Sequence, residues 1–114
     1  MTRKSGTRET SSYFKGKLFD INYAIAIHEG TAKRRLASVA TKISFQLSEA
    51  EVPQHFQKEF CGLRSLIRNS QKNSLTRRSL KTFSSIHNVT AAKYIKMLLD
   101  MQYFLQEEEL RRAG

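Results

Sequence analysis

The chain has 114 residues, of which 39% are hydrophobic, five are Gly and one is Pro. This length suits one domain with one compact core, and it leaves little room for a deep catalytic cleft. An all-β fold needs many tight turns, and those turns draw on Gly and Pro. The composition therefore predicts an all-α fold. We expect a compact bundle of about five helices over residues 12–114, preceded by a flexible basic arm over residues 1–11.

Positive charge dominates the surface chemistry of the chain. Twenty Lys and Arg stand against ten Asp and Glu, which gives a formal net charge of +10. An excess this large opposes compaction by self-repulsion, and a partner that neutralises it relieves that repulsion. The candidate partners are nucleic acid, an anionic membrane surface and an acidic protein. A solvated basic surface without such a partner is the alternative.

The single cysteine, Cys61, excludes an internal disulfide, which is compatible with a reducing compartment. No apolar run has the length of a signal-peptide core or of a transmembrane helix. We therefore expect a cytoplasmic protein. Residues 12–28 are only a weak candidate for a helix that lies on a membrane surface, so a membrane partner is not expected.

Apolar spacings of three and four predict two helices in the first half of the chain, over residues 12–28 and 32–47. Gly30 separates them and Thr31 is the predicted cap of the second. The apolar run over residues 23–27 predicts deep burial in the middle of the first helix. The predicted core stripes are Phe14, Leu18, Ile21, Ile25 and His28, and then Leu36, Val39, Ala40, Ile43 and Leu47.

The second half predicts three more helices, over residues 53–69, 75–87 and 91–112, with the main loop at 69–79. Residues 48–51 have the form of a capping box. There is no internal repeat and no sustained heptad pattern. The predicted core positions are Phe56, Phe60, Leu63 and Ile67, then Leu80, Phe83 and Ile86, then Tyr94, Ile95, Leu98, Leu99, Met101 and Leu105.

The basic residues are segregated from the acidic ones. Eight basic residues and no acidic one occur between Phe60 and Leu99, and four basic residues and no acidic one occur between Gly30 and Ser48. Such segregation creates a field of one sign, and Lys and Arg then bind phosphate oxygens in a salt-dependent manner. The predicted nucleic-acid contacts are Arg64, Arg68, Lys72, Arg77, Arg78, Lys81, Lys93, Lys96, Lys33, Arg34 and Arg35.

Residues 79–98 resemble the helix-turn-helix of DNA-binding regulators. The pattern is a helix with Phe83 and Ser84 at its contact positions, a break at Asn88 and Val89, and a second helix capped by Thr90. The resemblance implies that the second helix enters the major groove. The residues that would then face the groove or its phosphates are Thr90, Ala91, Ala92, Lys93 and Lys96. An ordinary helical hairpin in the core is the alternative, and we prefer it because the last helix is apolar on more than one face.

Patterns typical of catalysis or metal binding are weak. The Ser-x-x-Lys match at residues 12–15 lacks its partner motifs. His28, His55 and His87 are far apart in the sequence, and Cys61 adjoins an apolar stripe where an inert thiol is expected. We expect no enzymatic activity, no cofactor and no metal site.

The sequence therefore predicts a binding protein that contacts nucleic-acid phosphates through residues 60–99, alone or as a small subunit of a nucleoprotein assembly. The patterns do not distinguish DNA from RNA. One alternative is a protein–protein adaptor or a homodimer that uses residues 94–105 of the apolar last helix. A helix-turn-helix regulator built on residues 79–98 is the other.

Overall fold

The computed structural model describes residues 10–73 and 87–113, without the side chains of residues 69–73. The described chain is all-helical, which confirms the predicted fold class. Its four α-helices and two 3-10 turns are α1 (Ser12–Ile27), α2 (Ala32–Gln46), η1 (Glu49–Glu51), η2 (Gln54–Phe56), α3 (Gln57–Asn73) and α5 (Asn88–Ala113). The predicted helix over residues 75–87, with Leu80, Phe83 and Ile86, falls almost entirely outside the described residues.

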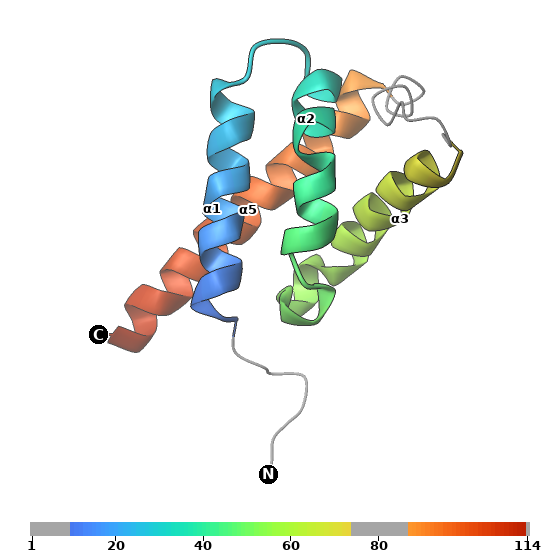
Figure 1. Cartoon of the computed structure of the whole chain (residues 1–114). Coiled ribbons are helices and arrows are strands. Elements are labelled where there is room, and N and C mark those ends of the chain that lie inside the picture. Colours follow the sequence, from blue (N-terminus) through green and yellow to red (C-terminus); the bar gives the residue numbers. More distant parts are fainter. Residues whose placement is uncertain (1–9, 74–86, 114) are drawn as a thin grey trace.

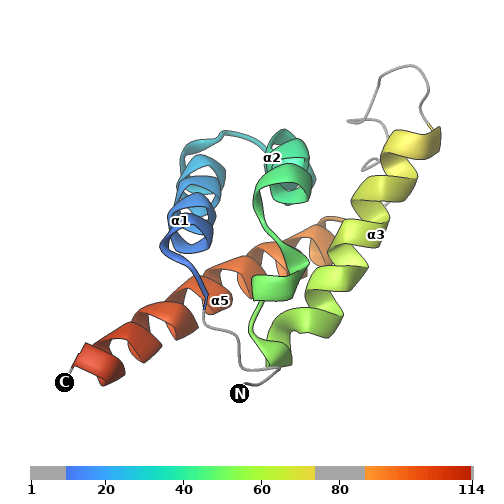
Figure 2. The same ribbon diagram turned by 60° about the horizontal axis from the view of Figure 1, so that its bottom comes forward.

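The helices form two layers. α1 and α2 lie side by side and antiparallel, and α5 crosses behind both of them (Figure 1). A second view shows α5 along one side of the molecule, with the α1–α2 pair above it and α3 at its flank (Figure 2). α2 and α5 each contact the three other helices, so these two elements hold the assembly together. No helix within the described ranges combines the length and the apolar character that crossing a membrane requires.

One continuous core fills the space between the layers. The apolar residues of the predicted stripes in α1, α2 and α3 are all buried, and only His28 is half-exposed. Leu98, Met101 and Leu105 supply the inner face of α5. Each fully buried Leu or Phe contributes about 1.5–3 kcal/mol relative to its exposed state. The periodicity of the sequence thus identified the core of the first three helices correctly.

Four details of the prediction are wrong. Leu99, a predicted core position, is 49% exposed. Residues 23–27 are not buried on every side, because only Ile25 is buried in the core, whereas Tyr23 is 59% and Ile27 is 64% exposed on the outer side of α1. α3 does not end at residue 69 but continues to Asn73, in a polar stretch that contains neither Gly nor Pro. The last helix begins at Asn88, so Asn88 is helical and does not break the chain.

The start of α1 is tied to the turn that follows α2. The Ser11 hydroxyl accepts a hydrogen bond from the Phe14 amide at 3.1 Å, which is an N-cap. Ser11 itself donates its amide to the Glu51 carboxylate at 2.7 Å, and the Thr10 hydroxyl donates to the Glu51 carbonyl at 3.0 Å. Thr10 and Ser11 therefore belong to the folded unit rather than to the predicted arm. The rest of that arm, residues 1–9, lies outside the described residues.

A buried amide fixes α1 against α5. Asn22 is only 4% exposed, and its Nδ2 donates to the Leu98 carbonyl at 3.1 Å and to Gln102 Oε1 at 2.7 Å. A polar group inside an apolar core is tolerated when it is hydrogen-bonded. These two hydrogen bonds fix which turns of α1 and α5 lie opposite each other.

We expect Phe60→Ala to lower the free energy of unfolding by about 3–5 kcal/mol, because it empties a fully buried site. Phe45→Ala is the matched control, since Phe45 is 77% exposed, and its effect should stay within about 0.5 kcal/mol. Urea unfolding followed by circular dichroism measures both. Equal losses in the two variants would contradict the described core.

Candidate nucleic-acid interface

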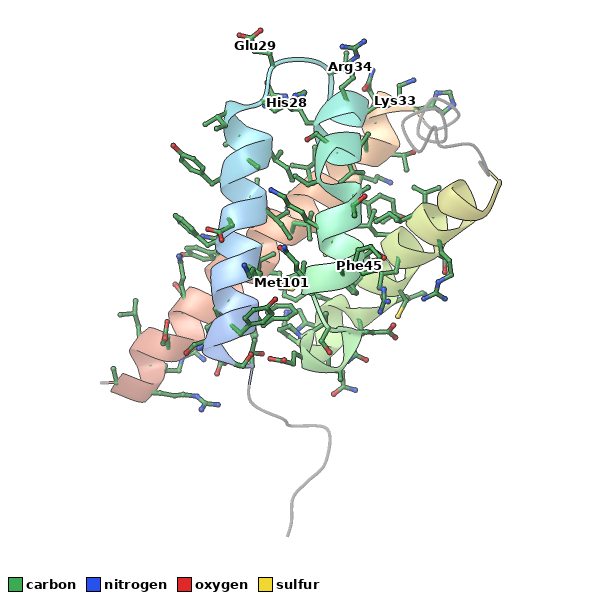
Figure 3. The ribbon with its side chains drawn as sticks, viewed as in Figure 1. His28, Glu29, Lys33, Arg34, Phe45 and Met101 are labelled. Carbon is green, nitrogen blue, oxygen red and sulfur yellow. The ribbon has the colours of Figure 1, made fainter. Side chains whose placement is uncertain are left out.

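Two helix N-termini meet at one end of the molecule. The Asn88 side chain, in the first turn of α5, accepts a hydrogen bond from the Lys33 amide in the first turn of α2, at 2.9 Å. Thr31 caps α2 as predicted, accepting from the Arg34 amide at 3.4 Å. Lys33 and Arg34 lie at the end of α2 that adjoins the start of α5 (Figure 3). Neither helix has an acidic residue in its first turn, so the partial positive charges of both N-termini are not offset there.

α3 brings a further cation to the same end. α3 runs antiparallel to α5, because a Cβ at Gly62 would meet Tyr94 Oη at 3.2 Å while Phe56 contacts Phe104 with ring centroids 5.9 Å apart. Continuing this register past Gly62 places Arg68 level with the first turn of α5. Arg68 is exposed.

We call the set Lys33, Arg34, Arg68 and Lys93 the basic end. Lys93 lies one turn into α5 and is exposed, and Lys72 follows Arg68 by one turn of α3. Glu29 lies at this end too, in the loop that joins α1 to α2 (Figure 3). The basic end keeps a net positive charge after this carboxylate is counted.

Three other predicted contacts interact with groups of the same chain. Arg64 forms an ion pair with Glu49 at 3.3 Å, and Lys96 forms one with Asp100 at 2.8 Å. Arg35 binds main-chain carbonyls: its Nε donates to Gly30 at 2.9 Å and its Nη1 to Ile25 at 3.2 Å. The Arg35 guanidinium thereby closes the α1–α2 loop.

The remaining predicted contacts, Arg77, Arg78 and Lys81, lie outside the described residues. The segment that carries them joins the end of α3 to the start of α5. Along the chain they are therefore flanked on both sides by helices that contribute to the basic end.

The second half of the predicted helix-turn-helix is wrong in its geometry. Asn88, Val89 and Thr90 are the first residues of a continuous helix rather than a turn and a cap. Ala91 is fully buried, so it cannot read a base edge. The first half of the motif lies outside the described residues.

Cys61 has no feature of an activated nucleophile. Its thiol donates to Glu49 Oε2 at 2.9 Å. This hydrogen bond, with partial burial and the negative charge of Glu49, raises the pKa of the Cys61 thiol above its ordinary value, against a smaller lowering by Arg64. Catalytic thiols require the opposite shift. Among residues 10–73 and 87–113, no three His, Cys, Asp or Glu side chains are grouped as a metal ion requires.

A hollow of about 450 Å³ adjoins the ion pair of Glu49 and Arg64, at the end of α2 away from the basic end. Tyr13, Phe45 and Glu51 line it beside Glu49 and Arg64. The two carboxylates already accept hydrogen bonds from Ser11, Cys61 and Arg64. The polar groups of the hollow are therefore largely satisfied by the fold itself.

Comparison of the chain with protein-family models, with curated proteins and with solved structures gives no match. The geometry of the chain alone therefore has to support any assignment of function.

Asn88→Ala should lower the free energy of unfolding by about 1 kcal/mol, the usual effect of removing a side chain that caps a helix. Asn88→Asp is the matched control, because it keeps an oxygen acceptor for the Lys33 amide. Urea unfolding of both variants tests this. If the Ala and Asp variants lose the same stability, the bond to α2 contributes nothing.

Glu49→Gln should make Cys61 react faster with iodoacetamide, with a reactivity profile shifted to lower pH, because the carboxylate that raises the thiol pKa is gone. Glu59→Gln removes a nearby exposed carboxylate and should leave the profile unchanged. Mass spectrometry measures the alkylation rate of each variant across a series of pH values. Superimposable profiles for the wild type and Glu49→Gln would refute the assignment.

Proposed function

We propose that the chain binds the phosphate backbone of nucleic acid through its basic end. The observation that supports the proposal is that the start of α2, the end of α3 and the start of α5, which carry Lys33, Arg34, Arg68 and Lys93, lie at the same end of the molecule (Figure 1). These residues are distant in sequence, and their sharing of one end supports a site rather than a scattered basic surface. Association through phosphates releases condensed counterions, which favours a surface of one sign.

The contacts would be made by side chains. The amides of Lys33 and Arg34 already donate to Asn88 and Thr31, so these main-chain groups are not available to a phosphate. Lys presents a compact charge, and Arg presents a planar fork that binds two phosphate oxygens at once. Contacts of this kind position a protein on nucleic acid without reading sequence. The proposal therefore covers DNA and RNA alike.

Arg77, Arg78, Lys81 and Lys72 extend the proposed contact set along the chain. A role as a small cytoplasmic subunit of a nucleoprotein assembly is compatible with this mode of binding. In such an assembly the basic end would contact phosphates, and another surface would contact protein.

The triple variant Lys33→Ala, Arg34→Ala and Lys93→Ala tests the proposal. We expect weaker binding to a mixed-sequence DNA duplex and to single-stranded RNA, measured by fluorescence polarisation at low salt. For the duplex, the slope of log K against log salt should become shallower by about 0.9 for each phosphate that the variant no longer neutralises. The loss of affinity should be similar for different sequences.

The control is Lys17→Ala, Lys42→Ala and Lys58→Ala, which removes the same charge from the other parts of α1, α2 and α3. It should retain most of the affinity. An equal loss in both triple variants would show that net charge alone drives binding. A wild-type chain with no affinity for either nucleic acid at low salt would end the proposal.

A further inference from the structure

The outer face of α5 carries a second regular stripe. Seven residues at alternating spacings of three and four are all exposed, namely Val89, Ala92, Lys96, Leu99, Tyr103, Gln106 and Leu110. We call them the outer seam. The four large apolar members are between 49% and 73% exposed. This spacing is the heptad pattern by which one helix packs along another, and it spans nearly the whole helix.

None of the described residues of this chain covers the outer seam. α5 turns its other side to the core through Ala91, Leu98, Met101 and Leu105, all of which are buried. A helix with apolar residues on two faces needs a second partner for the face that remains exposed. From the geometry of this face we infer that α5 pairs antiparallel with α5 of a second copy of this chain, seam against seam.

The order of residues along the seam favours a second copy in antiparallel register. When two α5 helices overlap over their full length, Leu99 faces Tyr103 of the second copy and Ala92 faces Leu110 of the second copy. A small residue opposite a large one lets the two helices approach closely. The two polar layers match as well, because Lys96 faces Gln106 of the second copy. A parallel pair would instead place Lys96 against its own copy.

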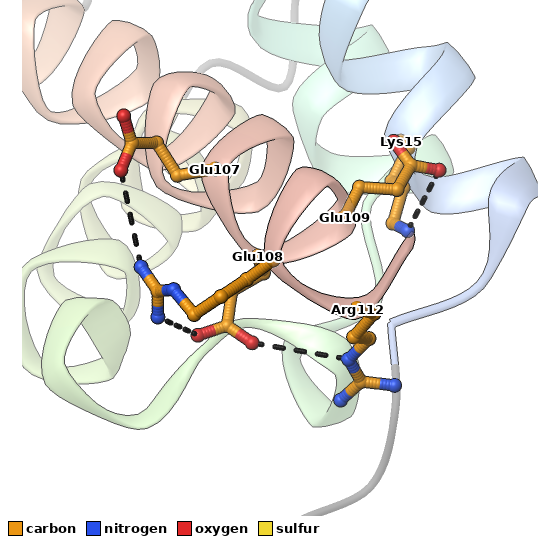
Figure 4. A network of polar contacts seen from close by, with 6 residues as sticks. Lys15, Glu107, Glu108, Glu109 and Arg112 are labelled. Carbon is orange, nitrogen blue, oxygen red and sulfur yellow. Dashed lines mark hydrogen bonds and ion pairs between the residues drawn. The ribbon is translucent and has the colours of Figure 1, made fainter. Parts of the chain in front are cut away.

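The charges beside the seam agree with the antiparallel arrangement. Lys93, in the first half of α5, comes beside Glu107 of the second copy. The acids of the second half already have partners within the chain. Glu107 contacts Arg111 at 3.8 Å and the Tyr103 hydroxyl, Glu108 contacts Arg111 at 3.4 Å and Arg112 at 3.9 Å, and Glu109 contacts Lys15 at 3.5 Å (Figure 4). Surface ion pairs of this kind contribute little to stability, so these acids can pair with cations of a second copy instead.

A twofold axis relates the two copies of the antiparallel pair, and one pair of like charges lies at this axis. Asp100 would lie near Asp100 of the second copy, and each is bonded to its own Lys96 at 2.8 Å. Four charges of alternating sign then surround the axis and compensate one another. The polar layers at Lys96 and Gln106 weaken such a pair but fix its register, so we expect a dimer that dissociates on dilution.

Analytical ultracentrifugation without nucleic acid, from about 5 to about 500 µM chain, tests the inference, because mass action makes the dimer concentration-dependent. The wild type should move from the monomer mass toward twice that mass. Leu99→Glu with Leu110→Glu should stay monomeric over the whole range, with the helical circular dichroism of the wild type. Ile27→Glu with Phe45→Glu, which changes two exposed apolar residues away from the seam, should dimerise like the wild type.

Cysteine cross-linking tests the register, in a Cys61→Ser background. Ala92→Cys combined with Leu110→Cys should form a disulfide-linked dimer on mild oxidation, because the two positions face each other. Leu110→Cys alone should not, since its own copy lies far away along the pair. A wild type that stays monomeric at the highest concentration overturns the inference. So does loss of the dimer in the Ile27→Glu, Phe45→Glu variant, or efficient cross-linking by Leu110→Cys alone.

Discussion

Burial of the inner face of α5 is the constraint on which the other helices depend. The side of the core formed by α5 consists of Leu98, Met101 and Leu105. Each remaining helix also makes a specific contact with α5. Asn22 fixes α1 through the Leu98 carbonyl, Asn88 joins α5 to the first turn of α2, and Tyr94 approaches α3 at Gly62. The position of every cation at the basic end therefore follows from apolar packing farther along the same helix. The packing of the core therefore determines where the cations of the basic end lie, and these cations do not determine the packing.

The distribution of charge along α5 makes a net charge of +10 compatible with a compact chain. Lys93 stands near the start of the helix, where cations from α2 and α3 join it, and Glu107, Glu108 and Glu109 stand near its end. The acids pair with Arg111, Arg112 and Lys15, so the charges at this end of α5 compensate one another. Among the described residues charge is therefore distributed unevenly, which gives this part of the molecule an electric dipole. An approaching polyanion would be oriented by the dipole before any contact forms.

The sequence predicted the fold class and the apolar stripes of α1, α2 and α3, because period and burial agree in helices with one covered face. It failed where a residue has a tertiary role. Asn88 has the propensity of a helix breaker, but its side chain caps a helix 55 residues away in the chain. Tyr23 and Ile27 resemble core residues and face outward, because no described helix covers that side of α1. The sequence predicted apolar surface on more than one face of the last helix, but it did not reveal the spacing of the outer seam, because Lys96 and Gln106 interrupt the apolar pattern. The exposure of the seam residues makes that spacing visible. For the candidate site, composition identified the basic stretches, whereas the placement of the end of α3 beside the start of α2 depends on packing that no local pattern contains.

The bond between Asn22 and the Leu98 carbonyl joins residues 76 positions apart, and this separation has a consequence for synthesis. A ribosome delivers α1 and α2 long before it delivers the surface against which they pack. Until the middle of α5 has emerged, Phe14, Leu18 and Ile43 have no complete core to enter. Contacts this distant in sequence form late and leave nascent chains open to chaperones and proteases. The decisive step of folding therefore waits for the middle of α5, even though α1, α2 and α3 are synthesised earlier.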